Sequence, residues 1–333
     1  MLFTLKRMSK PTRSGKSRGA NSSAKLRPQT ASAFDKAMHD LRHQSGAFPN
    51  VSVRWLLSAA AIAILGAIFC AWLTLCLLYW QGSWQLLYHP KALITRTPSN
   101  AGLTYESIHF ADTETGTAQL TGWWIPSADA RKTVLYLHGA DGNLSDSVDT
   151  LTSLHQQNFA IFAIDYRGYG LSQPIRDAGH PNEKQLRQDT EWALTWLTLT
   201  RNIPARNIVV YGSGLGANLA AELAADHSEL AGVVLDQPEL HPLTNIFNDS
   251  RSRLVPAHWL VKDRYDLSAI TTSLRIPSLW LFAESAQDQP RVQIPEAYQG
   301  ASGKKTSVWL NAPLTTDPHF ATSVKRWLDD LES

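Results

Sequence analysis

The stretch "IVVYGSGLGANLAAELA", from Ile208 to Ala224, decides the fold of this chain. An apolar segment meets a glycine-rich turn, and an alanine-rich segment typical of a helix follows. This order predicts the strand, turn and helix in which the motif G-x-S-x-G presents a nucleophilic serine. Within residues 212–216 the middle position is Gly214, and the only serine, Ser213, comes one residue early. The stretch therefore predicts the backbone of a nucleophile turn without its usual hydroxyl.

Apolar runs and helical patterns alternate on both sides of that stretch. Near-continuous apolar runs, typical of parallel strands buried on both faces, stand at 133–139, 159–166, 207–212, 232–236 and 278–283. Residues 107–110 and 119–126 are typical of paired edge strands, and 183–200 and 214–226 of helices. Strands that alternate with helices predict an α/β fold with a mostly parallel sheet between helical layers.

The N-terminal part of the chain differs sharply in composition. From Met1 to Arg54 there are eleven Lys and Arg against two acidic residues, and large apolar residues are few. Such a composition predicts a disordered basic tail over residues 1–52. The whole chain carries a net charge of only +2, so no nucleic-acid partner is expected.

A long uncharged segment follows the tail, from Trp55 to Tyr88. It exceeds the roughly 20 residues that a helix needs to cross hydrocarbon, and aromatic residues stand at both of its ends. It predicts one transmembrane helix over 53–80, with a juxtamembrane linker at 81–101 and a domain at 102–333. Because the basic residues precede the span, we expect a single-pass protein of the cell membrane, with its N-terminus cytoplasmic and its C-terminal domain extracytoplasmic.

Seven stretches in order carry a resemblance to a known family: "LTGWWIP", "VLYLHGADGN", "AIDYRGYGLS", "PNEKQLRQDTEWALTWL", "IVVYGSGLG", "VVLDQP" and "VKDRYDLSAITTSLRIPSLWLFAE". Over about residues 87–331 the chain resembles the α/β-hydrolase superfamily, within it the membrane-anchored abhydrolase branch related to serine-aminopeptidase-like hydrolases. The resemblance implies an α/β-hydrolase fold. It also implies cleavage of esters, thioesters or amides by a Ser–Asp–His triad, with no cofactor and no metal.

The resemblance implies an oxyanion loop at "LHGADG", residues 137–142. In that loop His138 and Gly139 shape the turn, and the backbone N–H near Ala140 acts together with that of Leu215. His138 is expected to support the loop and not to act as a base.

The three catalytic positions of the family depart from its pattern. Aligned on the motifs, the nucleophile, acid and base positions hold Gly214, Ala286 and Leu314. The nearby residues that could replace the triad are Ser213, Asp288 (or Asp236) and His319.

Two functions stay open at this point. The first is a membrane-anchored pseudo-hydrolase that binds an acyl or lipid-like ligand or a protein partner. The alternative is an active serine hydrolase of acyl esters, thioesters or amides with a displaced triad. Residues 241–265 are expected to form a cap, whose apolar side chains line a cavity or pack on the domain: Ile246, Phe247, Leu254, Trp259 and Leu260.

Overall fold

The computed structural model describes residues 35–36, 38–40, 51–110, 119–172, 179–284, 296–311 and 313–332. The chain divides into two units, Met1–Gly66 and Ala67–Ser333. The predicted tail at 1–52 lies mostly outside the described residues. The hydrolase-like part lies wholly in the second unit.

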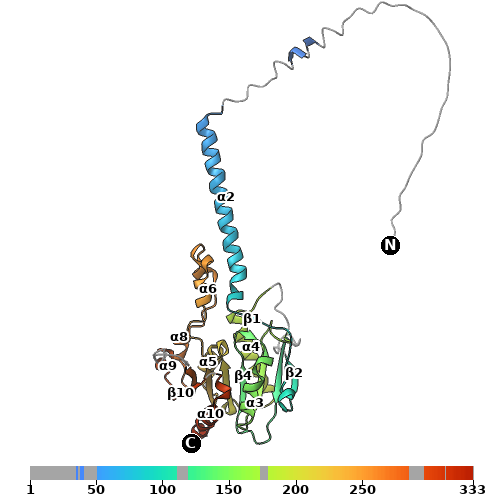
Figure 1. The fold of residues 1–333 in the computed structure, drawn as a ribbon, viewed down its shortest axis with the longest axis vertical. Helices are drawn as coiled ribbons and strands as arrows, with labels where there is room; N and C mark the ends of the chain where they lie inside the picture. The colour runs from blue at the N-terminus through green and yellow to red at the C-terminus, as the bar shows by residue number, and fades with distance from the viewer. Residues whose placement is uncertain are drawn as a thin grey trace, which may run out of the picture. The chain divides into compact units, whose positions relative to one another are not determined.

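The second unit is built on an eight-stranded sheet in the order β10-β9-β8-β7-β4-β6-β3-β2 (Figure 1). Only the β2–β3 and β3–β6 pairs are antiparallel. The strands are β2 (Glu106–Phe110), β3 (Leu120–Ile125), β4 (Thr133–Leu137), β6 (Ala160–Asp165), β7 (Ile208–Ser213), β8 (Gly232–Asp236), β9 (Ser278–Glu284) and β10 (Lys305–Asn311). The predicted mostly parallel sheet is confirmed. Its inner strands are buried on both faces, which explains their near-continuous apolar sequences.

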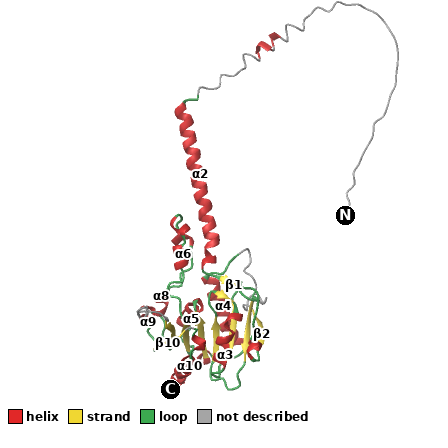
Figure 2. Cartoon of the chain, viewed as in Figure 1, coloured by secondary structure: helices red, strands yellow, loops and turns green. Residues whose placement is uncertain are grey.

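Helices cover both faces of the sheet (Figure 2). The helices on the sheet are α3 (Val148–His155), α4 (Glu183–Thr195), α5 (Leu215–Asp226) and α10 (Pro318–Glu332). The other helices of the hydrolase-like part are α6 (Thr244–Asn248), α7 (Ala257–Leu260), α8 (Leu267–Thr271) and α9 (Glu296–Gly300). Two hydrophobic cores result. One contains Leu186 of α4 and Leu219 of α5, and the other contains Leu151 of α3 and Val324 of α10. The sheet therefore lies between two helical layers, as the α/β-hydrolase fold requires.

The apolar N-terminal segment forms one helix, α2 (Val53–Gly82), of 30 residues. Together with the 3-10 turn that follows, it forms Val53–Leu86, the one helical segment in the described chain that is long and apolar enough to cross a membrane, with a mean hydropathy of 2.5. Its side chains are almost all exposed as far as Thr74, whereas Cys76 and Tyr79 are buried in the core of the second unit. One end of this helix is therefore part of the domain's packing.

The segment after α2 is tied to the domain by backbone pairing. A 3-10 turn (Ser83–Leu86) leads into β1 (His89–Pro90), which pairs in parallel with β5 (Asp141–Gly142). The His89 N–H donates to the Ala140 carbonyl at 3.0 Å, and the Nδ1 atom of His89 lies 2.6 Å from Asp141 Oδ1. The chain leaving the apolar helix thus directly supports the loop that follows β4.

Candidate active site

The turn between β7 and α5 has the strained geometry of a nucleophile elbow. Gly214 stands between the two elements with φ 57° and ψ −124°, a conformation that side chains with a Cβ rarely adopt. Its N–H donates to the Asp236 carbonyl at 2.9 Å, and its own carbonyl accepts from Ala217 N–H at 3.0 Å. The turn is therefore held in place from both β8 and α5.

The three glycines of the elbow have different physical reasons to be glycine. A Cβ on Gly212 would lie 2.1 Å from the Gly216 carbonyl oxygen, and one on Gly216 would lie 2.3 Å from that of Leu137. Both positions are thus closed to any side chain. A Cβ on Gly214 would meet nothing closer than 3.6 Å. The position that presents the nucleophile in the family therefore has room for a side chain and holds none.

Ser213 is the last residue of β7, where it stands opposite Asp236 of β8. Side chains two apart on a strand share a face, so Ser213 lies on the side of Tyr211, whose hydroxyl donates to Asp236 Oδ2 at 2.9 Å. Burial raises the pKa of Asp236 to about 6, although the hydroxyls of Tyr211 and Ser213 oppose that rise. The structure therefore brings Ser213 and Asp236 together below the elbow.

The structure places His319 at the start of α10, with an exposed side chain. Its backbone N–H donates to Asp317 Oδ1 at 2.8 Å, and no hydrogen bond joins its ring to Ser213 in the described chain. Leu314, at the family's base position, is buried in the hydrophobic core. Asp288 and Ala286 lie outside the described residues. Among the described candidates for a displaced triad, only Ser213 and Asp236, the alternative to Asp288 as the acid, are thus in contact.

Sequence reasoning missed a carboxylate at the elbow. Glu239 Oε1 lies 3.6 Å from the place of a Cβ on Gly214, and the Leu215 N–H is near enough to lower the pKa of this carboxylate. Burial raises the pKa of Glu239, the charge of Asp141 adds to the rise, and the Leu215 N–H opposes it. The only feature of the sequence that could have indicated Glu239 is its position, as an acidic residue three positions after the end of β8.

The backbone of Glu239 is fixed by Asn218 of α5. The Asn218 amide nitrogen donates to the Glu239 carbonyl at 2.8 Å, and its oxygen accepts the Glu239 N–H at 3.1 Å. Leu215 N–H is one of the two donors that the resemblance assigns to an oxyanion. In this structure the chain's own carboxylate lies beside that donor.

The expected oxyanion loop is held by buried tyrosines. The Tyr166 hydroxyl donates to the His138 carbonyl at 3.0 Å, and the Tyr169 hydroxyl donates to the Ala140 carbonyl at 2.9 Å. His138 Nδ1 lies 2.8 Å from the Gly139 carbonyl oxygen, so this nitrogen carries the proton. Burial lowers the pKa of His138 to about 4, and the ring is neutral at pH 7.

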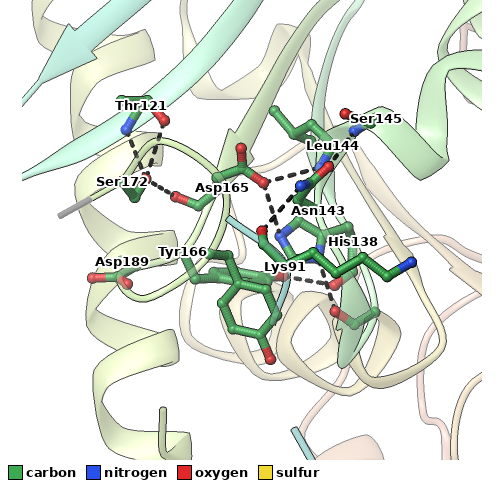
Figure 3. A network of polar contacts seen from close by, with 12 residues as sticks. Lys91, Thr121, His138, Asn143, Leu144, Ser145, Asp165, Tyr166, Ser172 and Asp189 are labelled. Carbon is green, nitrogen blue, oxygen red and sulfur yellow. Dashed lines mark hydrogen bonds and ion pairs between the residues drawn. The ribbon is translucent and has the colours of Figure 1, made fainter. Parts of the chain in front are cut away.

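A buried carboxyl group completes this loop (Figure 3). Asp165 Oδ1 accepts the Leu144 N–H at 3.0 Å and lies 3.5 Å from His138 Nε2, which has no other polar partner among the described residues. Burial raises the pKa of Asp165 to about 7. The pair is therefore a neutral imidazole facing a carboxyl that retains its proton into the neutral range. It supports the loop and is not a charged catalytic dyad.

The comparisons with known proteins agree with this architecture. The family described as serine aminopeptidase, S33, matches residues 128–290. The chain has the α/β-hydrolase fold, and its central part is similar to that family. Among the described residues, no group of three or more His, Cys, Asp or Glu is placed to hold a metal ion.

Three similar proteins align with different shares of this chain. The protein YfhR of Escherichia coli O157:H7 is 32% identical over 138 residues, which are 39% of this chain and 46% of that protein. YfhR of Salmonella typhimurium is 28% identical over 232 residues, or 64% of this chain and 74% of that protein. The structure of a Pyrococcus furiosus esterase aligns with a TM-score of 0.55 at 18% identity, over 74% of this chain and 98% of the esterase.

Proposed function

We propose that this protein is a membrane-anchored α/β-hydrolase-fold protein with a non-catalytic site, which binds an acyl or lipid-like ligand or a protein partner. One observation carries the proposal. Gly214 keeps the strained backbone of the nucleophile turn, in a place with room for a side chain, and supplies no hydroxyl. The turn has been kept as a scaffold while its chemical group is absent.

The neighbouring residues support the same proposal. A serine nucleophile needs a base within hydrogen-bond reach, and His319 is exposed at the start of α10 with no hydrogen bond to Ser213 in the described chain. Loss of the serine or the histidine of a triad costs on the order of 10⁶ in turnover. The carboxylate of Glu239 also lies beside the Leu215 N–H, where an oxyanion would be repelled. A retained fold with these features favours binding over turnover.

A hollow beside the cap offers a place for a ligand. It has a volume of about 430 Å³ and is lined by residues 240–244, 247, 248 and 264–266. Its wall includes Leu243, Phe247 and Tyr265 together with the opposite charges of Arg264 and Asp266. An apolar wall beside such a charged pair suits an acyl chain with a polar end.

Membrane anchoring is the second part of the proposal. The exposed part of α2, from Val53 to Thr74, is roughly 20 residues long, which is about the length that crosses 30 Å of hydrocarbon. Basic residues precede it and favour a cytoplasmic N-terminus with the hydrolase-like unit on the other side.

An active hydrolase is the second candidate function, and one contact favours it. Ser213 and the buried Asp236 lie together, on the face of the sheet that α10 also covers. A movement of the segment before α10 that brings His319 to Ser213 would complete a displaced triad. The similar Pyrococcus structure is that of an esterase.

Labelling with a fluorophosphonate separates these two functions. The full-length protein in detergent is treated with the fluorescent reagent, and Ser213→Ala serves as the matched variant. We expect no labelling of either protein, because no serine is activated. Labelling of the wild type that disappears in Ser213→Ala would overturn the non-catalytic proposal.

A further inference from the structure

The cap segment packs along the apolar helix and not only on the domain. The Tyr79 hydroxyl of α2 donates to the Ile246 carbonyl of α6 at 2.8 Å in a buried contact. Closer to the N-terminus of α2, the Trp72 Nε1–H donates to the Leu254 carbonyl at 2.9 Å. Both hydrogen bonds join residues of the same unit, 67–333. The residues that follow α6, 249–260, are called the cap tip here.

The position of these contacts along α2 sets the reach of the cap tip. Trp72 precedes the end of the helix at Gly82 by ten residues, or about 15 Å at the rise of an α-helix. Tyr79 precedes that end by only about one turn. The cap tip therefore extends roughly 10 to 15 Å along the helix, away from its C-terminal end.

This reach decides which part of α2 can lie in hydrocarbon. The helix has 30 residues, about 45 Å, whereas the hydrocarbon core of a bilayer is about 30 Å thick. If the last 20 residues lay in the core, the cap tip would be immersed with the Asp249–Arg251 ion pair and Arg253. Charged side chains at that depth cost several kcal/mol. The first 20 residues can lie in the core without that cost.

With α2 in this register, Trp72 stands at the edge of the hydrocarbon and the cap tip reaches the headgroup region. The exposed side chains of the tip suit such a place. Trp259 is 86% exposed and Leu254 is 62% exposed, so both large apolar side chains are accessible to lipid. Arg253 has no carboxylate partner in the described chain, so its charge is available to lipid phosphates. Tryptophan with arginine is typical of membrane interfaces.

We propose that the cap tip, residues 249–260, is a second membrane contact that inserts Leu254 and Trp259 into the interface of the bilayer that α2 crosses. The inference rests on the proposed anchoring by α2. It adds that the cap, with the hollow beside it, lies against the lipid surface. An amphiphilic ligand would then reach the hollow from the membrane and not from bulk water.

Fluorescent labels at three depths test this proposal in the full-length protein. Single cysteines are introduced by Trp259→Cys, Leu65→Cys and Ser228→Cys in a Cys70→Ala background, where the remaining Cys76 is buried. Leu65 is an exposed position within α2, and Ser228 is an exposed loop residue after α5. Each protein is labelled with NBD, placed in phosphatidylcholine–phosphatidylglycerol nanodiscs and exposed to spin-labelled lipid.

We expect the label at 259 to show a blue-shifted emission and to lose fluorescence to headgroup-proximal spin labels, while the label at 228 does neither. The label at 65 should be quenched by spin labels deep in the acyl chains. If spin labels deep in the acyl chains do not quench the label at 65, the anchoring by α2 itself is overturned. Quenching at 65 with no difference between 259 and 228 would overturn the cap contact alone. Thermal unfolding of each labelled protein, compared with the background protein, verifies that the fold is unchanged.

Discussion

The elbow at Gly214 and the loop at residues 138–142 are the two halves of one site, and they are built in different ways. The loop is held by buried side chains, with the hydroxyls of Tyr166 and Tyr169 on its carbonyls and Asp165 beneath it. The elbow is held by backbone bonds and by glycines that allow close approach. The difference teaches that one site can be held in shape in two ways, by buried side chains around the loop and by backbone bonds and close glycine contacts at the elbow.

The largest effect is expected at Gly216, where the elbow has no space. A Cβ there would lie 2.3 Å from the Leu137 carbonyl and 2.4 Å from that of His138. Gly216→Ala should therefore push α5 away from the loop and lower the free energy of unfolding by about 3 kcal/mol or more. Chemical denaturation measures this change. A loss below about 1 kcal/mol would show that the elbow and the loop are not closely packed.

The buried carboxyl of the loop predicts a pH dependence of stability. Burial raises the pKa of Asp165 to about 7 in the folded protein, against an ordinary value of 3.8. Between these values the folded state binds the extra proton, so its stability falls as pH rises from about 4 to about 7. The contribution is about 2 to 4 kcal/mol.

Asp165→Asn isolates that contribution, because an amide cannot ionise. His138, whose pKa is lowered to about 4, acts in the opposite direction between about pH 4 and 6.5, and it remains in both proteins. The free energy of unfolding of the variant minus that of the wild type should therefore be larger at pH 7.5 than at pH 4.5. Parallel profiles would mean that Asp165 is ionised when folded.

Gly214 should be sensitive to backbone strain and not to volume. Gly214→Val should lower the unfolding free energy by about 1 to 3 kcal/mol, the usual scale for a non-glycine residue in a rare conformation. Gly214→Ser should cost less, because a smaller unbranched side chain adapts to the open space around this position. Equal stability of the wild type and Gly214→Val would show that the strained turn is absent in solution.

The smallest effect is expected from single tyrosine hydroxyls of the loop. Tyr169→Phe removes one hydrogen bond to the Ala140 carbonyl, which still accepts the His89 N–H. The unfolding free energy should fall by about 1 kcal/mol. Tyr105→Phe, on the far side of the sheet from this carbonyl, is the matched control. A loss of more than about 3 kcal/mol would indicate that the whole loop depends on this bond.

Much of the fold could be predicted from the sequence because buried parallel strands require long apolar runs. The strands at 133–137 and 208–213 follow that pattern, as does the glycine turn after the second. The carboxylate of Glu239 could not be predicted, since it reaches the elbow through the path of a loop that no periodicity describes. The contact between Trp72 and Leu254 joins segments 182 residues apart and depends on the same kind of loop geometry.

Ester turnover by the purified full-length protein tests the central claim most directly. The hydrolysis of a p-nitrophenyl ester is measured for the wild type, Ser213→Ala and Glu239→Gln under identical conditions. A site that keeps the elbow without its hydroxyl predicts no turnover above the uncatalysed rate in any of the three proteins. Wild-type turnover that disappears in Ser213→Ala would establish a displaced serine, and turnover that disappears only in Glu239→Gln would establish a catalytic carboxylate. Either result would contradict the account.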